Sequence, residues 1–195
     1  MATMIRNSLY MGLLLSFAGA AAAAPEGSPT AGRWQEHKLA FAFMGFTSTY
    51  SCDGLADKLR SLLIAAGARP DAKVRAGVCS MGPGQPDRFA RADLTFWTLT
   101  PEDAADSSAP SGGSGSKGVP VNGTWKPVSI SLQSPRGLER GDCELVEQFA
   151  QKVLPLFTTR SVVNHTHCIP HQDSGSLVDL RFESLTAPKR PATGG

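Results

Sequence analysis

Three histidines lie close together near the C-terminus, in the stretch NHTHCIPHQD. His165 and His167 are two residues apart, so on a β-strand their side chains point to the same face. His171 follows a proline turn from which its ring can reach back toward that face. Three imidazole nitrogens suit zinc or copper, with water or Asp173 in the fourth position. The cluster predicts a metal site, and the competing interpretation is a solvated face beside a disulfide.

Four cysteines provide the second group of reactive side chains: Cys52, Cys79, Cys143 and Cys168. An even number in an exported chain predicts two disulfides. The two successive pairs have nearly equal spacing and similar surroundings, which predicts the pairings Cys52–Cys79 and Cys143–Cys168. The alternative is redox chemistry, because a helix N-terminus stabilises a thiolate, but the chain has no C-x-x-C motif.

An internal repeat in the sequence predicts the strands and helices that position these cysteines. Each half reads strand, helix, strand, strand, with apolar residues at period two in the strands and at helical spacing in the helices. The first half gives strands over 38–46, 73–80 and 92–100, with a helix capped by Ser51 or Asp53 that ends at Gly67. The second half gives strands over 128–132, 161–168 and 178–182, with a helix that Asp142 caps and Pro155 limits.

The predicted fold is therefore α+β, a duplicated β-α-β-β unit that forms a mixed sheet with both helices on one face. A crossover helix returns the chain so that the next strand runs parallel to the first. The cysteine that opens each helix and the cysteine that ends the next strand then meet at the same end. Whether the two units share one sheet or form two domains stays open, although a lone unit leaves its sheet edge bare.

The domain boundaries follow from this repeat and from composition. Residues 1–24 read as a signal peptide, with a short basic start, an apolar run and an alanine tract for cleavage. The units span 34–100 and 124–188, joined by a flexible linker over 101–123 that is rich in Ser, Gly and Pro, and followed by a disordered tail over 189–195. We expect a periplasmic or secreted protein.

The charge balance and hydropathy exclude two classes of partner. Lysine and arginine number 19 against 17 for aspartate and glutamate, so no basic face is expected for nucleic acid. The N-terminal apolar run is too short to span a membrane, which takes roughly 20 residues, and no second run follows.

A ligand-binding end follows from the predicted topology. In sheets with parallel strands, ligands bind beyond the carboxyl ends of the strands, where helix N-termini favour anions. That end gathers Phe46, Thr47, Tyr50 and Ser51 from the first half and Arg136, Arg140 and His171 from the second. The alternative is that the aromatic residues close the core and the arginines are solvated.

The search for catalytic motifs finds no zinc-protease, phosphate-loop or dinucleotide signature. An S-x-x-K match at Ser114 to Lys117 falls in the flexible linker. Acids such as Asp53, Glu139 and Asp142 could act with the histidines as a hydrolase, but no spacing selects them.

The stretches FMGFTSTYSCDGL, DCELVEQF and CIPHQ give the chain a resemblance to a group of small, uncharacterised exported proteins of proteobacteria. The resemblance implies a periplasmic or secreted setting and carries over no catalytic residue. Our hypothesis from the sequence is a non-enzymatic exported binding or interaction protein whose partner is an unidentified protein or small ligand. The alternative is a periplasmic zinc- or copper-binding protein that uses the three histidines, and a hydrolase ranks third.

Overall fold

The computed structural model describes residues 29–78, 82, 84–102, 120–172 and 174–188. The predicted signal peptide, most of the predicted linker and the predicted tail lie outside these residues. In chain order the elements are β1 (Thr30–Ala42), α1 (Cys52–Ala65), β2 (Lys73–Ala76), β3 (Arg91–Pro101), β4 (Val121–Ser131), η1 (Arg140–Asp142), α3 (Cys143–Lys152), η2 (Leu154–Leu156), β5 (Thr159–Asn164) and β6 (Asp179–Thr186). The α+β class is confirmed.

The strands form one six-stranded sheet in the order β2-β3-β1-β4-β6-β5. Every neighbouring pair is antiparallel, so the prediction of a mixed sheet was wrong. The crossover through α1 does return the chain in the direction of β1, as the sequence predicted. However, β3 lies between β1 and β2 and runs antiparallel to both, so the two like-directed strands never become neighbours.

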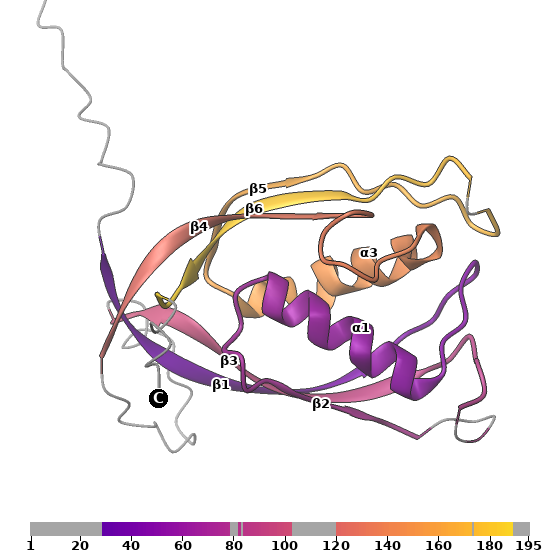
Figure 1. Ribbon diagram of the computed structural model, residues 1–195, viewed down its shortest axis with the longest axis horizontal. Coiled ribbons are helices and arrows are strands. Elements are labelled where there is room, and N and C mark those ends of the chain that lie inside the picture. The colour runs from indigo at the N-terminus through magenta and orange to yellow at the C-terminus, as the bar shows by residue number, and fades with distance from the viewer. Residues whose placement is uncertain (1–28, 79–81, 83, 103–119, 173, 189–195) are drawn as a thin grey trace, which may run out of the picture.

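The sheet is bent sharply at its centre, where β1 meets β4. These two strands pair only through Thr30–Gly32 and Val121–Gly123. Beyond that short contact they separate into two arms, one of β1, β2 and β3 and the other of β4, β5 and β6, and both helices lie between the arms (Figure 1). The core is therefore enclosed by a sheet folded around two helices.

Both helices bury an apolar face in this core, and the face of α1 is rich in leucine while that of α3 includes Phe149. Ser51 accepts a hydrogen bond from the Gly54 amide and caps α1 as the sequence predicted. Gly67 follows the helix with a φ of 102°, a conformation that glycine adopts without steric cost. The fully buried side chains of the two helices include Leu55, Leu59, Leu62, Leu63, Leu145, Val146 and Phe149.

Several strand boundaries differ from the prediction because polar and charged residues near the ends of the long strands interrupt the apolar alternation on which the prediction relied. Strand β1 begins at Thr30, not at Lys38, and pairs with β3 from Gly32 onward. Strand β4 begins at Val121 instead of Val128. One face of each extension is open to water, so it carries polar residues that weaken the apolar alternation. Strand β5 ends at Asn164. Beyond it, the His165 amide donates to the Asp179 carbonyl at 2.8 Å, and His167 forms an isolated bridge with Leu177.

The predicted disulfide between Cys143 and Cys168 is present, with the two Cα atoms 5.6 Å apart. It ties the first residue of α3 to the loop that joins β5 and β6. The predicted pairing of Cys52 with Cys79 stays a prediction, because Cys79 lies outside the described residues.

Replacing both Cys143 and Cys168 by serine should lower the free energy of unfolding by about 3.5 kcal/mol, the loop-closure entropy for a separation of 25 residues. Chemical denaturation of this variant and of the wild type measures the difference. A reducing agent should bring the wild type toward the variant. Equal midpoints for the two proteins under oxidising conditions would contradict the prediction.

Gly123 occupies the bend where the two arms meet. A Cβ atom at this position would lie 2.5 Å from Leu99 Cδ2 and 2.9 Å from Leu185 Cδ1. Both leucines are buried, one in each arm. The absence of a side chain at Gly123 thus allows the arms to close on each other.

Gly123→Ala should therefore destabilise the protein by about 1–3 kcal/mol through overpacking. Its exposed neighbour on β4 provides the control, since Asn122→Ala should change the free energy of unfolding by less than about 0.5 kcal/mol. Thermal or urea unfolding of the two variants measures both effects. If both variants unfold like the wild type, Gly123 has no packing role.

Candidate functional site

One face of α3 holds the segment that follows β1. Glu144, Gln148 and Lys152 are four residues apart and so lie along one side of the helix. Gln148 accepts a hydrogen bond from the Met44 amide at 3.4 Å and donates to the Met44 carbonyl at 2.8 Å. Lys152 donates to the Ala42 carbonyl at 2.9 Å. These side chains therefore satisfy backbone N–H and C=O groups on the edge of residues 42–44 with which no strand of the described residues pairs.

Glu144 extends this series into the loop after Met44. It is buried, and its Oε2 atom accepts hydrogen bonds from the backbone amides of Phe46 and Thr47 at 2.9 and 3.1 Å. The Thr47 hydroxyl in turn accepts from the His171 amide at 3.0 Å. Residues 42–47 are thus fixed to α3 and to the disulfide-bearing loop of the second half.

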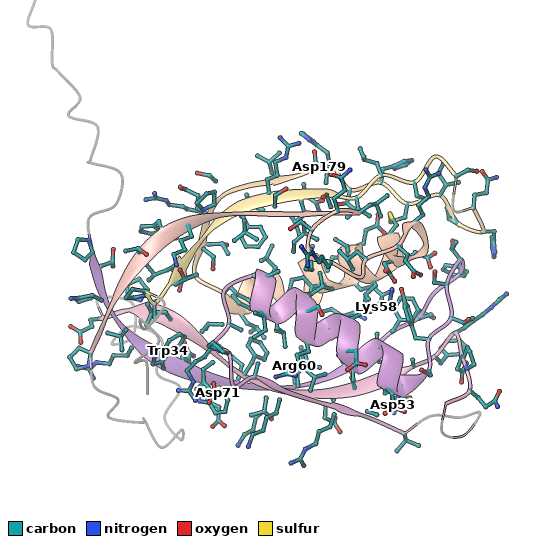
Figure 2. All side chains as sticks on the ribbon, viewed as in Figure 1. Trp34, Asp53, Lys58, Arg60, Asp71 and Asp179 are labelled. Carbon is teal, nitrogen blue, oxygen red and sulfur yellow. A yellow bond between two sulfur atoms is a disulfide. The ribbon has the colours of Figure 1, made fainter. Side chains whose placement is uncertain are left out.

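Just as α3 holds the segment after β1, helix α1 contacts the loop that follows β4. Lys58 donates to Asp142 Oδ2 at 2.6 Å and to the Gly137 carbonyl at 3.0 Å. It lies on the side of α1 that is turned toward α3 (Figure 2). The Glu139 amide also donates to Asp142 Oδ2, at 2.6 Å. Asp142 precedes α3 as predicted, but its carboxylate makes no cap hydrogen bond to this helix; the bond from the Glu139 amide instead caps η1.

Tyr50 completes this cluster by donating its phenolic O–H to Asp142 Oδ1. Tyr50 is 6 % exposed and Asp142 is 2 % exposed. Burial, followed by the hydrogen bond to Asp142 and the charge of that carboxylate, raises the pKa of Tyr50 above its ordinary value. The structure therefore places Tyr50 in a buried junction between the two halves and not on the open ligand-binding surface that the sequence predicted.

A groove of about 460 Å³ opens where β1 ends, β3 begins and α3 runs past. We call it the loop-end groove. Its lining residues are Ala42, Phe43, Met44, Phe89, Arg91, Gln148, Gln151 and Lys152. Two of them, Gln148 and Lys152, hydrogen-bond the backbone of Met44 and Ala42. The wall formed by α3 therefore holds the wall formed by residues 42–44 in place.

Large apolar side chains stand open to water at this groove. The register that places Ala42 opposite Arg91 continues through hydrogen bonds from the Phe43 amide to Ala90 and from the Gly45 amide to Arg88. Met44 therefore lies opposite Phe89, on the same face of the sheet. Met44 and Phe89 are 53 % and 58 % exposed, and Phe46, two residues beyond Met44, is also 53 % exposed.

The charges lining the groove all have one sign. Arg91 and Lys152 are the two cations, and no carboxylate is present among the lining residues. Within the described part of the chain, the Arg91 guanidinium forms no ion pair, although Asp93 stands two residues along the same strand. The groove thus combines apolar walls with a positive potential.

The other residues of the predicted ligand-binding end do not line this groove. Ser51 is used as the cap of α1, and Arg136 and Arg140 are exposed on the loop before α3. The basis of that prediction, the carboxyl ends of parallel strands, is absent from an antiparallel sheet. Phe46 and Thr47, which the sequence grouped with that end through the same loop, do lie on the segment fixed by Glu144.

The three histidines have separate surroundings. His165 Nδ1 lies 3.4 Å from Asp179 Oδ2, His167 pairs through its backbone with Leu177, and the His171 ring lies against Phe46 at 5.8 Å between centroids. Among the described residues, no three His, Cys, Asp or Glu side chains form a group that could hold a metal ion. Asp173 lies outside them. The zinc or copper site and the hydrolase hypothesis stay predictions of the sequence.

The groove was not predicted from the sequence, although a signal for it was present. Apolar residues occupy both parities at the end of β1, with Phe41 and Phe43 facing the core and Met44 and Phe46 facing outward. A half-buried strand normally alternates apolar and polar residues, so an apolar pair on the outer face indicates a contact surface.

Comparison of the chain with known protein families, curated proteins and solved structures finds no match. In the part of the chain that the structure describes, none of the helices has the length and apolar character needed to cross a bilayer.

The Tyr50 environment leads to a prediction about alkaline pH. Because its folded pKa is raised, the neutral phenol contributes stability that is complete below the unfolded pKa of about 10 and is lost as pH rises above it. Each pH unit above 10 should cost about 1.4 kcal/mol through this group. The chain has two tyrosines, Tyr10 and Tyr50, so Tyr50 is the sole phenol of a protein that comprises residues 25–195.

Absorbance of the mature protein at the phenolate band measures this directly. The folded protein should show no phenolate between pH 10 and its alkaline unfolding, whereas the urea-unfolded chain should titrate near pH 10. A native titration near pH 10 with the fold intact would contradict the burial of Tyr50 against Asp142.

Proposed function

We propose that this chain is an exported binding protein that engages a segment of a partner protein in the loop-end groove. It acts in the periplasm or as a secreted protein, as the apolar start and alanine tract of the sequence predict. The disulfide between Cys143 and Cys168 supports this setting, since such bonds persist in oxidising compartments.

We further propose that the protein consists of two related β-α-β-β units. The order of elements supports this proposal, because in each half the last strand lies between the other two. The reciprocal contacts also support it, since each helix holds the loop that follows the first strand of the opposite half. Each unit alone leaves its long first strand with a bare edge, so neither folds well without the other.

The exposed, fixed apolar side chains of the groove carry the binding proposal. Contiguous apolar patches on soluble proteins commonly mark interaction sites. Met44 and Phe46 protrude from a backbone that Glu144 and Gln148 hold in one conformation. A preorganised surface of this kind loses little conformational entropy on binding, so it favours recognition of a partner.

Site-specific photocrosslinking tests the proposal. With a photoreactive phenylalanine analogue at position 44, cells that export the protein should give a defined protein adduct. The same analogue at Val162, which is 50 % exposed on the edge strand β5, should not. Phe89→Ser should reduce the adduct at position 44 by about tenfold. Because Phe89 is 58 % exposed, this substitution should change the free energy of unfolding by less than about 0.5 kcal/mol. Absent adducts, or equal adducts at positions 44 and 162, would contradict the proposal.

A further inference from the structure

Two polar groups of the loop-end groove have no partner in the described structure. The Arg91 guanidinium and the Gln151 carboxamide are both exposed, and neither makes a hydrogen bond or an ion pair with another described residue. They lie on different elements, β3 and α3, that border the same apolar floor. The neighbouring Gln148 and Lys152, in contrast, are engaged with the backbone of residues 42–44.

The chemistry of these two groups indicates which ligand groups could bind to them. A guanidinium presents its N–H donors in a planar fork that matches the two oxygens of a carboxylate. A carboxamide both donates and accepts, as the backbone of an extended peptide requires. Lys152 uses two of its three donors for the Ala42 carbonyl and Gln148 Oε1, so one remains for an anion.

The apolar residues set the position of this anion relative to the rest of the ligand. Phe89 lies two residues before Arg91 on the chain and on the same outer face, and Met44 stands opposite Phe89. Alternate side chains of an extended peptide point to the same face, so an apolar side chain seated between Met44 and Phe89 brings a carboxylate two residues along the peptide to Arg91. No acid among the lining residues competes for it.

We infer that the loop-end groove binds an extended peptide segment in which a carboxylate lies two residues from an apolar side chain, with Arg91 holding the carboxylate. This inference rests on the proposed function and adds the chemical class of the partner. The carboxylate comes from an Asp or Glu side chain or from a peptide C-terminus, two sources with the same chemistry at Arg91.

Three short acetylated peptides that share the sequence Leu-Ala distinguish these sources. In the first, Glu follows Ala and the end is amidated; the second ends at Ala with a free C-terminal carboxylate; in the third, Gln follows Ala and the end is amidated. Calorimetry or amide chemical shifts of the mature protein measure their affinities. At least one carboxylate peptide should bind about tenfold more tightly than the neutral peptide.

Arg91→Gln should remove this preference and leave the affinity for the neutral peptide unchanged. Arg75→Gln on β2, an exposed cation outside the groove lining, is the matched control and should keep the preference. The double variant Met44→Ser with Phe89→Ser should weaken all three peptides. Amide spectra of each variant establish that the fold is retained.

The inference is overturned if no peptide binds, if the wild type shows no preference for a carboxylate, or if Arg91→Gln keeps it. Binding to vesicles of anionic phosphatidylglycerol, without binding to the peptides, would assign the cations to a membrane surface instead. If photocrosslinks at position 44 form but the carboxylate preference is absent, only this inference fails. If both fail, the proposed function fails as well.

Discussion

The carboxylate of Asp142 joins the two halves of this protein, and the remainder of the architecture depends on that junction. It is almost completely buried, which is costly for a charge unless partners surround it. The partners are Lys58 and Tyr50 from the first half and the Glu139 amide from the second. This cluster connects helix α1 to the loop before α3, and the sheet itself joins the arms through three residue pairs between β1 and β4.

The same cross-connection explains how apolar side chains remain exposed in a fixed position. Residues 43–47 follow the end of β1, where a chain would normally become irregular. The side chains of Glu144, Gln148 and Lys152 satisfy backbone groups of residues 42–47 in place of a neighbouring strand. Met44 and Phe46 are held open to water by the opposite half, so the loop-end groove exists only in the assembled fold. The geometry of this groove therefore depends on the junction at Asp142.

Much of the local structure could be predicted because short-range patterns control it. The leucine spacing of α1, the Ser51 cap and the pairing of Cys143 with Cys168 depend on residues within one unit. The mixed sheet was wrong because strand direction does not determine strand adjacency: β2 runs with β1, yet β3 separates them. Tyr50 was predicted on a ligand surface because the loop that carries it follows a strand whose carboxyl end was expected to border a binding site. Its partner Asp142 is distant in sequence, so local patterns gave no basis for pairing them.

The sequence by itself determined the helices, most strands, one disulfide and the α+β class, since apolar periodicity and cysteine spacing act over short distances. The tertiary structure decided the antiparallel order, the bend at Gly123 and the burial of Tyr50. It also decided that Met44, Phe89 and Arg91 share one groove with Gln151. These features arise where residues distant in the chain meet. Their energies depend on burial and on hydrogen-bond partners that no local pattern encodes.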